Sequence, residues 1–351
     1  AVEMDYAQES DSTVVVVTDQ GRLATMAHSP EEQVWGWSRQ ICGGSFANDI
    51  ARIKSVAVIP APDESHDQIW VVVERTINGA TKQYVEFFEE PFRQVDPNQA
   101  KEKAFFVDSG LSLDGFNSAT DPIDITDITQ ADPVVVKTVS GHNYTNGHHI
   151  RIRDVVGMTE LNGAIFEVAG ATERTLQLNT LDGATIDGTG FTAYAYGGQT
   201  RRTGTAITGL NHLVGETVDV LGDGAPQPPQ VVAGDGTVTL AHEAAEGSIG
   251  LHYDSDLKTL KIVPTTRSGA HEMRLKRIDR VFVRLLDTVG GSVGPESDTL
   301  DPIIMRDPDD SLTQALEPFT GDVELTFEDS WERGVEVFVR QDQPLPMTVL
   351  A

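Results

Sequence analysis

Cysteine is almost missing from this chain of 351 residues, because Cys42 is the only one. A single cysteine excludes an internal disulfide framework and a zinc site built from cysteines. Long apolar runs are missing as well, and stretches such as Val14–Val17 fall far short of the ~20 residues that a membrane-spanning helix needs. No signal peptide is recognisable before or after Met4. We therefore expect no membrane insertion, and we expect the chain to begin at a cut in a longer protein.

Basic residues are scarce. Lys and Arg together number 26 against 54 Asp and Glu, which gives a formal net charge of −28. Nucleic-acid grooves and anionic membrane surfaces are bound by basic patches, so this balance argues against both kinds of partner. The hydrophobic share of 39% and the charged share of 23% are those of a globular protein rather than a disordered one.

Helical spacing of apolar residues is also rare. The best candidates, Pro97–Ala104 and Ser311–Leu316, are each only about two turns long. Short β-branched runs bounded by Gly, Pro and Asn recur along the rest of the chain, and this pattern is typical of strands joined by tight turns. The sequence therefore predicts an all-β fold.

Residues 1–92 contain two repeats of one plan: a Val-rich strand, a hairpin turn and a partner strand. Asn78-Gly79 is a strong hairpin signal, because both residues tolerate the positive φ that a two-residue turn requires. Antiparallel meanders of this length are typical of propeller blades. A closed propeller needs at least about four blades, so we expect residues 1–92 to be propeller-like blades of a truncated ring.

Two further β regions follow. Residues 133–198 contain short strands that mostly end near Gly or Asn, which predicts a small closed barrel or sandwich. Towards the C-terminus, two segments place their valines on one face and their charged ends on the other: Arg280-Val281-Phe282-Val283-Arg284 and Glu336-Val337-Phe338-Val339-Arg340. This alternation predicts antiparallel strands whose valines form a core on one face.

The candidates for chemistry are few, and each has a simpler structural interpretation. Cys42 has no recognisable paired base and precedes Gly43-Gly44, so we expect a partly buried structural thiol. His148 and His149 are neighbours that point to opposite faces of a strand and cannot chelate one metal ion together. No phosphate-binding G-x-x-x-x-G-K motif is present. We predict no catalytic, cofactor-binding or metal-binding residues, no cofactor and no enzymatic activity.

An acidic turn and a pair of tryptophans complete the candidates. Asp307, Asp309 and Asp310 could offer oxygen ligands to calcium, but a proline interrupts them and no Glu closes the loop, so a solvated turn is favoured. Trp35 and Trp37 are two apart and share one face of a strand. They could stack on a sugar or pack in a core, and the spacing favours core packing.

Several stretches resemble bacteriophage tail proteins of the nozzle or hub type. The resemblance begins near Ser12 and continues to the C-terminus, and seven segments carry it. Three are short: Ser55-Val56-Ala57-Val58-Ile59-Pro60, Tyr84-Val85-Glu86 and Asp108-Ser109-Gly110-Leu111. The others are Val34-Trp35-Gly36-Trp37-Ser38-Arg39, Ile69-Trp70-Val71-Val72-Val73-Glu74-Arg75-Thr76-Ile77-Asn78-Gly79-Ala80-Thr81, Gly209-Leu210-Asn211-His212-Leu213-Val214-Gly215-Glu216-Thr217-Val218 and Val339-Arg340-Gln341-Asp342-Gln343-Pro344-Leu345-Pro346-Met347-Thr348-Val349-Leu350. A second resemblance, of Val156-Gly157-Met158-Thr159-Glu160-Leu161-Asn162-Gly163 and Gly188-Thr189-Gly190-Phe191-Thr192-Ala193-Tyr194, is to the FCCH-like β module of phage structural proteins.

These resemblances imply the domain organisation. Residues 120–203 would be an inserted FCCH-like barrel, and residues 93–119 a connector with the first strand of the C-terminal β domain. Residues 204–351 would be one or more C-terminal β-sandwich-like domains. Asp108–Gly115 and Ile207–Leu221 would then be neighbouring strands of one domain, on either side of the insertion. The FCCH-like module is named after a domain of ubiquitin-activating enzymes. No ubiquitin chemistry is implied here, because the module carries no catalytic cysteine or nucleotide site.

The function implied by the resemblance is structural. We expect a virion protein of the tail of a short-tailed phage, which self-associates into a ring, expected to be a hexamer, on a tail adaptor protein. Phage DNA would pass through the lumen without specific binding, because acidic walls repel phosphate. The alternative is a glycan-binding or glycan-cleaving tail component that uses Trp35, Trp37 and exposed acids.

Overall fold

The structure is a computed structural model, and it describes residues 1–9, 12–29, 34–47, 49–63, 65–90, 92, 101–113, 121–262, 265–266, 269–270, 275–306, 315–327 and 331–350. The predicted all-β class is confirmed. Helical structure in the described residues is limited to three 3-10 turns, η1 (Lys101–Lys103), η2 (Thr159–Leu161) and η3 (Asn211–Leu213). Of the two predicted helices, Pro97–Ala104 is described only from Lys101 and contains η1, and Ser311–Leu316 lies largely outside the described residues. None of the described helices is long and apolar enough to cross a membrane.

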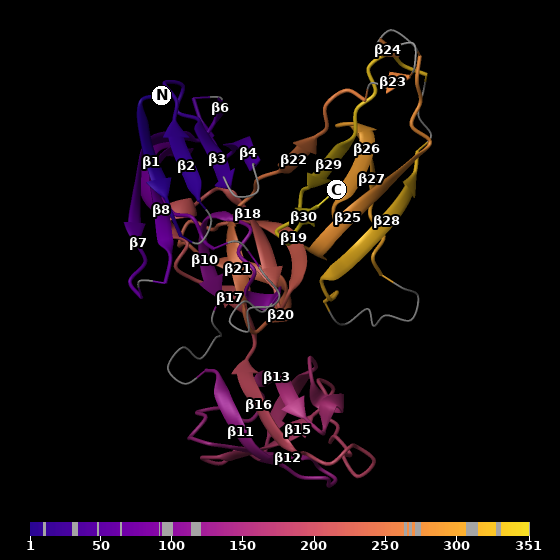
Figure 1. Cartoon of the computed structure of the whole chain (residues 1–351). Helices are drawn as coiled ribbons and strands as arrows, with labels where there is room; N and C mark the ends of the chain where they lie inside the picture. The colour runs from indigo at the N-terminus through magenta and orange to yellow at the C-terminus, as the bar shows by residue number, and fades with distance from the viewer. Residues whose placement is uncertain are drawn as a thin grey trace.

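The N-terminal part consists of two antiparallel meanders that share one core (Figure 1). The first has the order β1 (Glu3–Ala7), β2 (Thr13–Val17), β3 (Leu23–Ser29) and β4 (Val34–Gln40), and the second has β7 (Arg52–Pro60), β8 (Asp67–Ile77) and β9 (Ala80–Phe87). A short hairpin, β5 (Ser45–Phe46) with β6 (Asp49–Ile50), joins them. Asn78 and Gly79 both have positive φ, as the predicted hairpin requires. We refer to this part as the meander unit.

Two carboxylates cover the edge where the meanders meet. Glu3 accepts a hydrogen bond from the backbone N–H of Val56 at 3.0 Å, and Asp5 accepts one from Val58 at 2.7 Å. The outer edge of β7 would otherwise present unpaired N–H groups. The two carboxylates accept hydrogen bonds that a neighbouring strand would otherwise accept.

A sheet that is split in the sequence follows the meander unit. Its order is β10 (Asp108–Leu113), β21 (Gly247–Leu251), β18 (Thr217–Gly222) and β19 (Ala225–Val231), and β17 (Gly204–Ile207) pairs with β20 (Val238–Ala244) beside it. β10 therefore precedes residues 121–203 in the chain and the other strands follow them. We call β10 and β17–β21 the split-sheet unit.

The strand order corrects one expectation. β10 and the chain at Ile207–Leu221 belong to one sheet but are not neighbours, because β21 pairs with β10 on one side and with β18 on the other. All five residues of β21 are buried, which suits a central strand.

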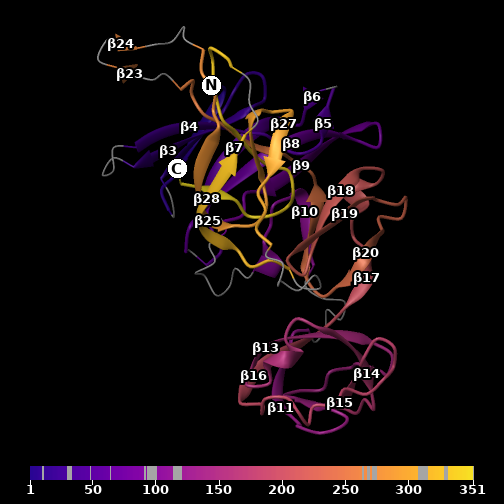
Figure 2. The same ribbon diagram turned by 90° about the vertical axis from the view of Figure 1, so that its right-hand side faces the viewer.

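Between β10 and β17 the chain forms a closed six-stranded barrel (Figure 2). Its order is β11 (Ile123–Ile128), β12 (Val135–Thr138), β15 (Thr175–Asn179), β14 (Ile165–Ala169), β13 (His149–Val156) and β16 (Tyr196–Arg202). Alternate residues point inward, as Ile150 and Ile152 do on β13, and both are fully buried. In both views the barrel stands apart from the other sheets, at the lower end of the molecule.

The C-terminal part contains two main sheets. One has the order β22 (Ser255–Lys258), β29 (Phe338–Gln341), β26 (Ser292–Glu296) and β27 (Thr299–Pro302), and the other β28 (Phe319–Thr326), β25 (Arg280–Thr288) and β30 (Thr348–Val349). A two-residue pair, β23 (Thr265–Thr266) and β24 (Gly269–Ala270), lies beyond them. Val283, Val337 and Val339 are buried in the shared core with Val281 packed against it, so the predicted valine face is confirmed.

Candidate functional site

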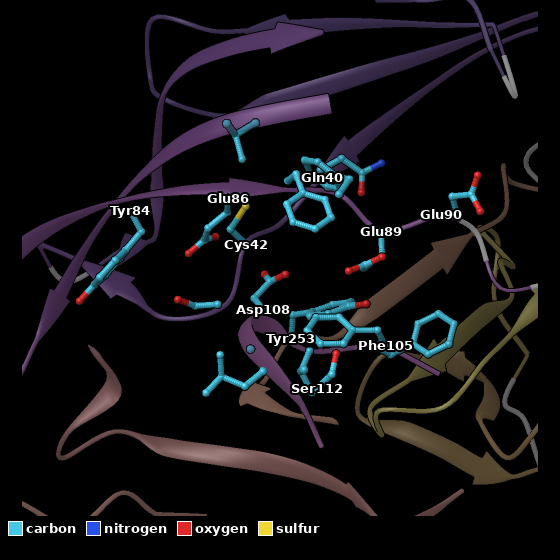
Figure 3. A pocket seen from close by; sticks show the side chains of 18 of the residues that line it. Gln40, Cys42, Tyr84, Glu86, Glu89, Glu90, Phe105, Asp108, Ser112 and Tyr253 are labelled. Carbon is cyan, nitrogen blue, oxygen red and sulfur yellow. The ribbon is translucent and has the colours of Figure 1, made fainter. Parts of the chain in front are cut away.

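The described part of the chain contains a pocket of about 990 Å³ between β9 and the segment that leads into β10 (Figure 3). Aromatic and acidic side chains form part of its walls. Among them are Tyr84, Glu86, Glu89, Phe105, Asp108 and Tyr253. In Figure 3 the carboxyl groups of Glu89 and Asp108 both point into the space beside the Tyr253 ring.

A fully buried arginine pairs with Glu86, one of the residues that line the pocket. Arg75 on β8 is 0% exposed, and it forms a bidentate pair with Glu86 of β9, in which Nη2 lies 3.0 Å from Oε2. Its Nε donates to the carbonyl of Gly43 at 2.7 Å. This bidentate geometry satisfies the guanidinium in a place where an unpaired charge would be very costly.

The Gly43-Gly44 dipeptide makes room for that arrangement. A Cβ on Gly43 would lie 2.6 Å from the carbonyl oxygen of His252. Gly44 has φ +87° and would bring a Cβ to 3.0 Å from Arg75. The two glycines therefore let the loop after β4 approach both β8 and the end of the split sheet.

Burial shifts the acid–base behaviour of three pocket groups. It raises the pKa of Asp108 to about 6, although the N–H of Gly43 and the charge of Arg75 act in the opposite direction. Burial, together with the charge of Asp108, raises the pKa of Cys42 to about 12. The pKa of Tyr253 is raised for the same reasons. A thiol with so high a pKa stays protonated at neutral pH, so this grouping does not supply a nucleophile.

Cys42 is buried in the core of the meander unit, in agreement with its interpretation as a structural thiol. In the native protein we expect its reaction with a maleimide at pH 7.5 to be on the order of a thousandfold slower than that of a free thiol, because both access and thiolate fraction are low. A matched control replaces Cys42 with Ala and Val231, which is 63% exposed, with Cys. The control should react rapidly, and Cys42 should react only after denaturant is added. Fast native labelling of Cys42 would contradict the prediction.

The histidine pair does not form a metal site. Thr145 contacts both ring nitrogens of His148, whereas His149 places Nδ1 2.8 Å from both carboxylate oxygens of Glu243. Among the described residues no group of three or more His, Cys, Asp and Glu side chains could hold a metal ion. Asp307, Asp309 and Asp310 lie outside the described residues.

The expectation that Trp35 and Trp37 pack in a core is wrong. They are 60% and 61% exposed, and the core of the meander unit contains no residue of β4. Their shared face was predicted correctly, but Trp37 lies opposite Met26 and Trp35 opposite His28, on the face of the sheet away from the core residues Val15, Val17 and Leu23. Spacing tells which residues share a face and not whether that face meets a partner.

Sequence reasoning missed two groups of residues. One is the Arg75–Glu86 pair, whose signal was a charged residue inside the apolar run of β8. The other is a set of basic side chains on the barrel, whose signal was the period-two pattern His149, Arg151, Arg153.

A separate sequence pattern, Gly290-Gly291-Ser292-Val293-Gly294, has the G-x-S-x-G spacing of a nucleophile elbow. Ser292 begins the strand β26 instead of preceding a helix, so the elbow geometry is not formed.

No protein-family model matches the chain, and no curated protein matches it.

Proposed function

We propose that this chain is a structural virion protein that forms part of a tail nozzle or hub ring of a short-tailed phage. The proposal originates in the sequence resemblance, which implies a ring on an adaptor and no enzymatic activity. The structural observation that supports self-association is the β4 edge, where Trp35 and Trp37 are more than half exposed and, among the described residues, no strand pairs on the outer side. Exposed edges that carry large aromatic side chains are usually covered by a partner.

The charge of the chain supports the second half of the proposal. A net charge of −28 gives a surface field that repels phosphate. Acidic side chains facing a lumen would let DNA slide past without the counterion-driven binding that a basic groove produces. The acidic walls of the pocket at Glu89 and Asp108 would contribute to the same field.

Class averaging of electron micrographs tests the proposal, on this chain and on a version extended upstream. We expect sixfold rings with a central channel, and we expect the double substitution Trp35→Ala with Trp37→Ala to abolish them. Trp331→Ala is the matched control, because Trp331 is 65% exposed but lies in the C-terminal part. Rings that persist in the double variant would exclude the β4 edge as the contact. Monomers throughout with the extended chain would exclude ring formation by the chain alone and favour the alternative function described next.

The same tryptophans favour one second candidate, a glycan-binding tail component. Two indole rings exposed on one face of a strand provide a stacking surface for sugars. If the chain binds glycans, we expect saturable binding of host surface polysaccharide. This binding should be lost in the Trp35→Ala, Trp37→Ala variant and retained in Trp331→Ala. Loss of rings without any polysaccharide binding would favour the nozzle function.

A further inference from the structure

The outer face of barrel strand β13 carries a stripe of basic side chains. His149, Arg151 and Arg153 alternate with the buried Ile150 and Ile152, so all three point away from the barrel core. On the neighbouring strand β16, Arg201 lies directly opposite Arg151 in the ladder. Like charges opposite one another destabilise a sheet unless something neutralises them.

Three acidic side chains of the split-sheet unit neutralise this stripe. Asp223, in the β18–β19 turn, lies 2.8 Å from Nη1 of Arg151, and Glu243, on β20, lies 2.8 Å from His149. Glu246, between β20 and β21, pairs with Arg153 through one oxygen and with Arg201 at 3.3 Å through the other. The hydroxyl of Thr203 donates to Glu243 at 2.9 Å. We call the four basic residues His149, Arg151, Arg153 and Arg201, together with the three acids Asp223, Glu243 and Glu246, the interdomain ion-pair cluster.

Hydrogen bonds within the split-sheet unit, which do not involve the barrel, position Asp223 and Glu246. Asp223 accepts hydrogen bonds from the backbone N–H groups of Ala245 at 3.0 Å and Glu246 at 3.1 Å. The backbone N–H of Asp223 donates to the carbonyl of Glu246 at 2.8 Å. These bonds tie the two turns of the split-sheet unit together, so their carboxylates form one preorganised acidic surface.

The centre of the cluster is buried, yet among the described residues no apolar core spans the interface. Glu246 is 2% exposed, Arg201 4% and Asp223 5%. The apolar core of the barrel and that of the split-sheet unit contain no residue in common, among either their buried members or the apolar side chains packed against them. The side-chain contacts that the described residues show between the barrel and the split-sheet unit are ion pairs and hydrogen bonds.

We propose that the interdomain ion-pair cluster is a clamp that fixes one orientation of an otherwise movable barrel. The chain enters the barrel after β10 and leaves it at Thr203, so two connections hold it when the clamp is open. Removing one side of a buried ion pair leaves an uncompensated charge, which regains water only if the two surfaces separate. Loss of the clamp should thus release the barrel as a folded body. The inference is independent of the ring proposed above.

Distance measurement between two spin labels tests the clamp in the full chain. The labels replace Leu181 on the barrel and Val231 on β19, which are 54% and 63% exposed, with Cys42 changed to Ala. We expect a narrow distance distribution in the parent. Arg153→Glu places a carboxylate against Glu246 and against Glu102, which is 3.8 Å from Nη1 of Arg153, and should broaden the distribution so that most molecules leave the parent peak.

Two further variants keep the test decisive. Glu246→Lys added to Arg153→Glu restores an opposite-charge pair and should recover part of the narrow peak. Arg284→Glu, in an exposed pair with Asp322 on the C-terminal sheets, should leave the distribution unchanged. Hydrogen exchange at Ile150 and Ile152 reports whether the barrel remains folded.

The outcomes separate as follows. Broadening with retained protection of Ile150 and Ile152, reversed by the added Glu246→Lys, supports the clamp. An unchanged distribution in a folded Arg153→Glu protein overturns it, because other contacts would then orient the barrel. Loss of protection at Ile150 and Ile152 also overturns it, because the ion pairs would then hold the barrel fold rather than its orientation.

Discussion

Replacing Arg75 with Met should destabilise the meander unit by about 3–5 kcal/mol, the usual cost of removing one partner of a buried ion pair. Arg75 is fully buried, and its loss would leave the Glu86 carboxylate, whose side chain is 19% exposed, without its bidentate partner. It would also leave the carbonyl of Gly43 without the Nε donor and remove a positive charge that lowers the pKa of Asp108. Three groups thus lose stabilisation at once, and the largely buried Glu86 carboxylate keeps only partial access to water.

Urea unfolding followed by tryptophan fluorescence measures the effect, because Trp35, Trp37 and Trp70 lie in the meander unit. Arg22→Met is the control in the same unit, since Arg22 pairs at 2.6 Å with Asp49, which is largely exposed. That control should barely move the transition, because exposed pairs contribute little. Adding Glu86→Met to Arg75→Met should recover part of the loss, because no buried carboxylate then remains unpaired. Equal effects of Arg75→Met and Arg22→Met would show that burial of the pair contributes nothing.

The residues that sequence reasoning interpreted correctly are those whose signal is local. The Asn78-Gly79 turn, the valine faces at Val283 and Val339, and the short strands of residues 133–198 each follow from neighbours within about ten residues. Alternation also predicted that Trp35 and Trp37 share a face. Local patterns predict which residues form a strand and which side chains share a face of it, because both depend on the two-residue period of the backbone.

What sequence reasoning missed depends on contacts between distant segments. β10 pairs with β21, more than a hundred residues later in the chain, and no residue in Asp108–Leu113 encodes that partner. The same holds for the pocket, where Cys42, Glu86 and Asp108 come from three separate segments. Long-range pairing across an inserted barrel carries no periodic signal, so the candidate site could not be assembled from the sequence.

Burial determines how much a cross-strand ion pair contributes to stability. Arg75–Glu86 and Arg284–Asp322 are both cross-strand bidentate pairs, yet the first is buried and the second lies in solvent. In sequence each is simply a charge on a strand. The surrounding apolar run of β8 distinguishes Arg75. A charge buried in such a run must be paired, because an unpaired buried charge strongly destabilises the fold.

Gly247 should be the most sensitive glycine of the split-sheet unit. A Cβ at this position would lie 1.9 Å from the carbonyl oxygen of Leu221, which belongs to the paired strand β18 and cannot rotate away. Gly247→Ala must therefore push β21 and β18 apart at the central strand of the sheet. We expect a loss of about 3 kcal/mol, the upper part of the range for overpacked sites.

Hydrogen exchange at Val220 and Ile249 measures that loss, because these residues face each other across the β18–β21 ladder. Gly234→Ala is the matched control, since a Cβ there meets no atom within 4 Å. Protection should fall in Gly247→Ala and stay at the parent level in Gly234→Ala. Because Gly247 follows Glu246 directly, the displaced strand should also carry the carboxylate away from Arg153 and Arg201. An intact sheet in Gly247→Ala would mean that β21 can shift within the core without losing its pairing, which its full burial argues against.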